Sequence, residues 1–107
     1  MASEQRAPQD PLLTAFKRSL ADTEPDAQHA PALTALWWAG KGDWERAHRI
    51  VMDEESAEAA WVHAYLHRVE GDLPNARYWY RQAGRSECKQ SLEAEWDAIA
   101  GTLLAQA

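Results

Sequence analysis

One stretch near the middle of the chain, residues 60–84 (AWVHAYLHRVEGDLPNARYWYRQAG), most constrains the fold. It holds all three Tyr and two of the four His, and Gly71-Asp72 interrupts it near its centre. Glycine readily adopts the left-handed backbone that ends a helix, and an aspartate carboxylate can cap the next helix. Pro74 then falls in a first helical turn, where its missing N–H costs nothing. The stretch therefore predicts two helices joined by a tight turn.

The first of these two helices, at about residues 57–70, has almost no side that is typical of solvent exposure. At 100° per residue its side chains fall into four groups. The groups are an aliphatic face (Val62, Leu66, Val69), a polar face (His63, His67, Glu70), a small face (Ala60, Ala64) and an aromatic and cationic face (Trp61, Tyr65, Arg68). A helix that is specialised on every side usually has neighbours on several sides, so we expect this helix at the centre of the domain.

The rest of the chain carries the same helical signals. Apolar residues recur at spacings of three and four, and the segments follow capping residues or prolines. The expected elements are a flanking helix over 10–21, a first hairpin over 31–55, a second hairpin over 56–84 and a capping helix over 87–106. Residues 1–9 are polar and without apolar period, so they predict a disordered tail. The sequence thus predicts an all-α protein of about six helices, with a single domain over 10–107.

The capping helix is expected to be amphipathic. Ser86 is its expected N-cap, and an apolar stripe follows on one side. Its opposite side is acidic, with Glu93, Glu95 and Asp97. Such a helix would close the open end of a stack of hairpins.

An internal repeat relates the two hairpins. Gly42-Asp43 and Gly71-Asp72 lie 29 residues apart. The same shift aligns Leu33 with Val62, Ala35 with Ala64, Ala47 with Ala76 and Val51 with Tyr80. Stacked hairpins that bury each other's faces are typical of solenoid repeats, in which the terminal elements act as caps.

The second hairpin resembles a tetratricopeptide repeat. The matching positions are Ala64 in the first helix, Gly71-Asp72 at the turn, and Ala76, Tyr80 and Ala83 in the second helix. The resemblance covers residues 32–84, and the offset is shorter than the ~34 residues usual for that family. His63 and His67 stand where the family usually has Leu and Tyr. The resemblance implies antiparallel helical hairpins stacked as a short right-handed array.

In the family that the hairpins resemble, the first helix of each hairpin lines a concave groove that binds extended peptides. Carried over to this chain, that role falls on Trp61, Tyr65 and Arg68, with Glu58 at the edge. Trp, Tyr and Arg are also enriched at binding hot spots. The alternative is that a terminal helix covers Trp61 and Tyr65, which then belong to the core. The first interpretation predicts a non-catalytic scaffold that binds a protein or peptide partner.

A second candidate site is the polar face of the same helix. His63, His67 and Glu70 share this face, and His48 on the preceding helix could approach them. Two His four residues apart can chelate a divalent ion, with a carboxylate as a third ligand. A hydrogen-bonded structural pair and general acid–base chemistry are the alternatives.

Composition and charge argue against several classes of function. The net charge of −6 argues against a protein that binds nucleic-acid phosphates. No apolar run approaches the ~18 residues of a membrane span. The lone Cys88 cannot form an internal disulfide, and no signal-peptide pattern opens the chain, so we expect a cytoplasmic protein.

No motif for catalysis or cofactor binding is present. The sequence contains no Gly-rich phosphate loop, paired Cys motif or Ser nucleophile motif. We therefore expect no enzyme activity and no cofactor. A structural role with self-association into a homo-oligomer, through Trp38 or the stripe of Arg77, Arg81 and Arg85, is the third alternative.

Overall fold

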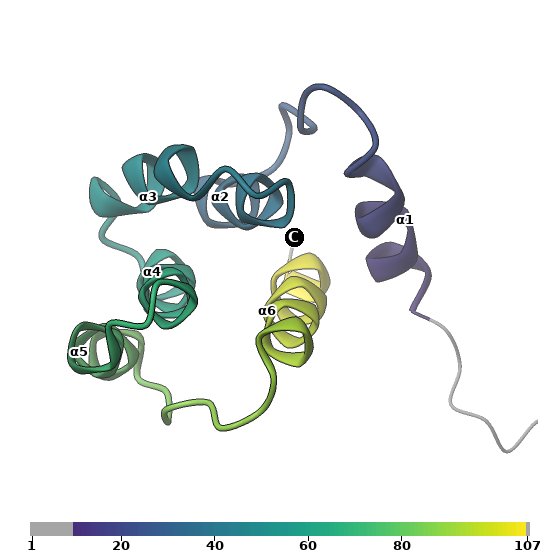
Figure 1. Ribbon diagram of the computed structural model, residues 1–107. Helices are drawn as coiled ribbons and strands as arrows, with labels where there is room; N and C mark the ends of the chain where they lie inside the picture. Colours follow the sequence, from purple (N-terminus) through teal and green to yellow (C-terminus); the bar gives the residue numbers. More distant parts are fainter. Residues whose placement is uncertain (1–9, 107) are drawn as a thin grey trace, which may run out of the picture.

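The computed structural model describes residues 10–106, and over this range the chain is all-α, as the sequence predicts (Figure 1). The six helices are α1 (Pro11–Ser19), α2 (Pro31–Gly40), α3 (Trp44–Met52), α4 (Ala57–Val69), α5 (Leu73–Ala83) and α6 (Leu92–Gln106). The tail expected over residues 1–9 lies outside the described range. None of these six helices has both the length and the apolarity that crossing a bilayer requires.

Helices α2 and α3 form one hairpin and α4 and α5 form the next, and their two turns have the same backbone geometry. Gly42 and Gly71 have φ angles of +86° and +85°, in the left-handed region that favours glycine. Asp43 and Asp72 follow them, and each carboxylate accepts a hydrogen bond from the backbone N–H three residues further on. The internal repeat in the sequence therefore corresponds to a repeat in turn geometry.

Helix α4 occupies the centre of the fold, as expected. It packs against α2, α3, α5 and α6, and Figure 1 shows it between α3, α5 and α6. All nine residues from Ala59 to His67 are buried. Ala64 is 0% exposed, and its small side chain allows a neighbouring helix to approach closely. Helix α4 consequently has almost no solvent face.

Helix α6 covers one side of α4, and Trp96 ties α6 to α1 and α2. The Trp96 indole stacks on Phe16 of α1 with ring centroids 5.5 Å apart. Its Nε1–H donates a hydrogen bond to the Leu36 carbonyl of α2 over 2.9 Å. One side chain thus joins three helices that are distant in sequence.

Helix α6 begins later than the expected start at residue 87. The Ser91 hydroxyl accepts a hydrogen bond from the Ala94 backbone N–H, so Ser91 takes the capping position that the sequence assigned to Ser86. The segment between α5 and α6 is correspondingly longer than expected.

Candidate functional site

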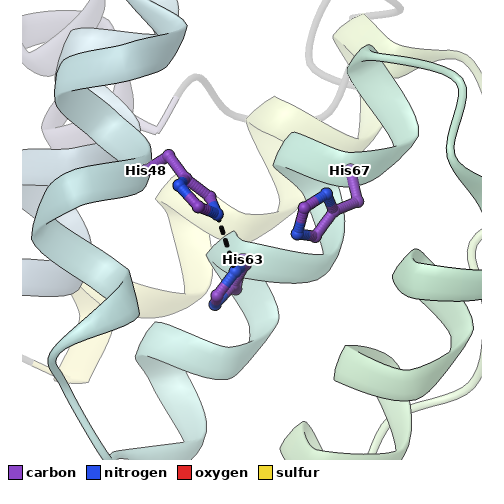
Figure 2. Close-up of side chains that lie close together, drawn as sticks. All are labelled: His48, His63 and His67. Atoms are coloured by element: carbon purple, nitrogen blue, oxygen red, sulfur yellow. Dashed lines mark hydrogen bonds between the residues drawn. The ribbon is translucent and has the colours of Figure 1, made fainter.

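Three of the four histidines meet between α3 and α4. His63 and His67 lie one turn apart on α4, so their rings project from the same side of that helix. His48 comes from α3, which packs against α4. Figure 2 shows the three rings turned toward one another from the two helices. The structure thus brings together the three histidines that the sequence proposed.

The ring nitrogens are close enough to share a ligand. Nε2 of His48 lies 3.1 Å from Nε2 of His63, and this contact is drawn as a dashed line in Figure 2. One ring nitrogen from each of His48, His63 and His67 lies within 4.8 Å of the others. We call these three residues the histidine cluster.

Two tryptophans enclose the histidine cluster. Trp44 stacks on His48, with centroids 4.7 Å apart and an interplanar angle of 11°. Trp79 of α5 stacks on His63, with centroids 3.9 Å apart and an angle of 13°. His63 and His67 are 4% and 6% exposed, whereas His48 is half-buried. The cluster is therefore shielded by aromatic rings and reaches the surface beside His48.

Glu70 takes a different position from the one proposed. Its Oε2 lies 3.3 Å from Nδ1 of His67, and its side chain is largely exposed. Glu70 belongs to a second group of possible ligands, with His67 and Asp72, whose atoms also lie within 4.8 Å of one another. A carboxylate on the outer ring nitrogen orients a histidine and strengthens its other nitrogen as a ligand. Glu70 can therefore position His67 without joining the histidine cluster.

Hydrogen bonding in the cluster is incomplete. Nδ1 of His63 is buried and has no hydrogen-bond partner among the described residues. A buried polar atom usually finds a partner, so each exception calls for an explanation. Nδ1 is not the ring nitrogen of His63 that contacts His48, so a ligand shared through Nε2 would leave it unpaired as well.

Burial lowers the pKa of two of the three histidines in the cluster. Burial, followed by the nearby His48 and His67 rings, lowers the pKa of His63 from 6.5 to about 4. Burial and His67 also lower the pKa of His48, against the opposite effect of Glu70 and Glu45. Neutral imidazoles are the form that binds metal ions, so these two residues need not lose a proton first.

The aromatic and cationic face of α4 is buried, which corrects the expectation of an exposed surface there. Trp61 and Tyr65 are each 7% exposed, because α6 packs over this side of α4. The Arg85 guanidinium also lies over the Trp61 ring, 3.4 Å from its centroid. The sequence left open whether Trp61 and Tyr65 line an exposed groove or are covered by a terminal helix. The structure shows the second arrangement, in which both side chains belong to the core.

Arg68 is held by α6 instead of facing a partner. Its Nη1 donates to Oε1 of Glu95 over 2.5 Å, and its Nη2 donates to the Gln90 carbonyl over 2.6 Å. The Tyr80 hydroxyl of α5 donates to Oε2 of Glu95, also over 2.5 Å. Burial and the hydrogen bond to this carboxylate raise the pKa of Tyr80. Glu95 thereby ties α4, α5 and α6 together.

Glu95 is the polar residue that sequence reasoning placed wrongly. It was assigned to the acidic outer side of the capping helix, but it is 2% exposed. Arg68 could have indicated that Glu95 is buried. It is a cation on a helix that has almost no solvent face, and the face that it shares with Trp61 and Tyr65 contains no acidic residue. A buried guanidinium needs such a partner.

The sequence analysis also did not identify the two tryptophans that stack on the histidine cluster. Apolar periodicity assigns Trp44 and Trp79 only to buried faces. Trp44 precedes His48 by one turn on the same helix, and residues at this spacing are neighbours on the helix surface. Nothing comparable in the sequence connects Trp79 to His63.

Glu58 is half-buried at the edge of an apolar cleft of about 330 Å³. The cleft lies beside the first turns of α2 and α4 and the end of α6. Its lining consists of Ala30, Pro31, Ala32, Leu33, Glu54, Ser56, Glu58, Leu103 and Gln106. Of the four residues proposed to bind a partner, Glu58 alone lines this acidic-rimmed cleft.

Compared with models of protein families, with curated proteins and with solved structures, the chain shows no match.

Replacing Glu95 by Gln should destabilise the fold. The change leaves the Arg68 guanidinium buried without its counter-charge, which typically costs roughly 3 kcal/mol or more. The exposed Glu93, two residues away, provides the matched control, and Glu93→Gln should change the unfolding free energy by no more than about 0.5 kcal/mol. Urea unfolding followed by circular dichroism measures both. Equal stability of the two variants would contradict the role given to Glu95.

Acid should weaken the metal-free protein through His63. The unfolded chain binds a proton on this ring near pH 6.5, and the folded chain does so only near pH 4. The unfolded state therefore holds more protons between these values, and the unfolding free energy falls as the pH drops from 6.5 to 4. The lowered pKa corresponds to about 3 kcal/mol at full effect.

Urea unfolding at several pH values, in the presence of a chelator, tests this effect. His63→Gln removes the titrating ring and should flatten the dependence over this range. An unchanged slope in the variant would assign the acid sensitivity to other groups.

Proposed function

We propose that this protein binds one divalent transition-metal ion through His48, His63 and His67. The observation that carries the proposal is the convergence of three ring nitrogens from two helices to within 4.8 Å. His63 and His67 supply two ligands from one turn of α4, and His48 supplies the third from α3. The spacing of His63 and His67 in the sequence thus provides two ligands, and the packing of α3 against α4 provides the third.

The ligand set favours ions that prefer nitrogen. Imidazole suits Zn²⁺, Cu²⁺ and Ni²⁺, whereas Mg²⁺ and Ca²⁺ prefer oxygen ligands. Two nitrogens bound to Zn²⁺ at 2.0–2.1 Å in a tetrahedral arrangement lie about 3.3 Å apart. The 3.1 Å between His48 and His63 is close to this value, so binding requires mainly an approach of His67.

The surroundings support a metal ion over a purely hydrogen-bonded cluster. Three histidines share one space that holds a single short nitrogen-to-nitrogen contact, so their ring nitrogens are not all used in hydrogen bonds to one another. The pKa of His63 is low enough that it carries no proton charge to oppose a cation at neutral pH. Glu70 on His67 is the kind of outer carboxylate that accompanies metal-binding histidines.

Metal titration of the untagged full chain tests the proposal. Isothermal titration with Zn²⁺, under competition from a chelator, should give one ion per chain. His48→Gln should weaken binding by more than about 100-fold, beyond the effect of changing an outer residue.

The matched control distinguishes the histidine cluster from the second group of His67, Glu70 and Asp72. Asp72 belongs only to that second group, and Asn replaces Asp well as a helix cap, so Asp72→Asn should leave affinity unchanged. Absence of Zn²⁺ binding, or loss in Asp72→Asn with retention in His48→Gln, would overturn the proposal.

As a second function, we propose that the protein is a tetratricopeptide-like helical-repeat scaffold that binds a protein or peptide in the cytoplasm. Support for stacked repeats comes from the matching geometry of the two turns at Gly42 and Gly71. Support for a binding surface comes from the acidic-rimmed cleft, where Glu54 and Glu58 stand beside an apolar floor. This chemistry fits a partner with basic and apolar side chains. A second copy of the chain is the alternative occupant.

Charge reversal at the cleft tests this second function. Partners captured from a native lysate should be lost with Glu58→Lys and kept with Glu55→Lys, because Glu55 is exposed but does not line the cleft. Quantitative mass spectrometry compares the two variants, and light scattering reports whether the captured partner is another copy. Identical capture by both variants would contradict a role for the cleft.

A further inference from the structure

We infer that the ion in the histidine cluster keeps one coordination position outside the protein, open to a small lone-pair donor or small monoanion that enters beside His48. This inference rests on the proposed metal binding. It assigns an exchangeable ligand to the ion, and so distinguishes the site from a closed structural metal centre.

The protein supplies three ligands to an ion at this place. Within the described chain, the group of His, Cys, Asp and Glu atoms that lie mutually within 4.8 Å at this place contains only His48, His63 and His67. Structural zinc sites are almost always closed by four protein ligands, whereas sites with three protein ligands hold water or substrate in the fourth position. A four-coordinate ion here must take its fourth ligand from solvent.

Glu70, the nearest candidate for a fourth protein ligand, points to the wrong side. Its carboxylate lies 3.3 Å from Nδ1 of His67. Figure 2 shows the other ring nitrogen of His67 turned toward His48 and His63. The two nitrogens of an imidazole point away from each other, so one ion cannot bind both the inner nitrogen of His67 and this carboxylate.

The exposure of the three histidines indicates from which side a ligand from solvent can reach the open position. His63 and His67 are buried, and Trp79 covers the face of His63. His48 is half-buried, and it lies on α3, at the edge of the cluster. A ligand from solvent therefore approaches past His48.

The size and chemistry of the ligand follow from the same surroundings. Trp44 and Trp79 stack directly on the histidine rings and restrict the space around the ion. An ion with three neutral imidazoles keeps its double positive charge, which favours a donor with a lone pair or one negative charge. Water, azide and imidazole are donors of this kind.

Cobalt substitution tests the inference with the untagged full chain. Co²⁺ has visible absorption bands whose position and intensity change when a ligand is exchanged. We expect one Co²⁺ per chain, with bands that shift on addition of azide or imidazole and saturate with one added ligand per ion. The shift should be lost in His48→Gln and retained in Asp72→Asn.

The possible failures are distinguishable. If Co²⁺ binds to the wild type with one ion per chain but neither azide nor imidazole alters its bands, the open position is refuted and the metal site stands. If the ligand-sensitive bands persist in His48→Gln, the ion does not depend on His48, and the inference fails. If no Co²⁺ binds, both the proposed metal binding and the inference fail.

Discussion

The burial of α4 on nearly all sides is the constraint on which the rest of the structure depends. A helix with nine consecutive buried residues cannot turn its polar side chains to water. Each polar group on it must then find a partner inside the protein or pay for its desolvation. His63, His67 and Arg68 are three such groups. His63 contacts His48 of α3, His67 contacts Glu70 at the end of α4, and Arg68 binds Glu95 of α6. The polar chemistry of this protein is thus concentrated where α4 meets its neighbours.

The two sides of α4 resolve this constraint in different ways. On the side of α6, Arg68 and Tyr80 both bind Glu95, so the charges of Arg68 and Glu95 compensate each other within the fold. On the side of α3, the histidines have mainly each other, and Nδ1 of His63 is left over. A compensated network holds helices together and offers nothing to a ligand. The histidine cluster, where three ring nitrogens converge to within 4.8 Å, is the side that can accept one.

The sequence predicts much of this arrangement because helix periodicity is a local property. The six helices, the glycine turns and the shared face of His63 and His67 all follow from spacing along the chain. The position of His48 depends on how α3 packs against α4, and spacing within one helix does not determine that packing. The same limit explains Glu95, since its burial depends on which side of α6 contacts α4. The exposed groove was expected for the same reason, because residue spacing does not reveal which helix covers Trp61.

Metal binding by this protein requires an ion between α3 and α4, and crystallography with zinc tests this most directly. Diffraction from zinc-grown crystals, recorded at the zinc absorption edge, locates the ion independently of any affinity measurement. We predict one anomalous peak per chain, about 2.1 Å from one ring nitrogen each of His48, His63 and His67. A peak bound only by His67, Glu70 and Asp72 at the surface, or no peak at the cluster, would contradict metal binding by the three histidines.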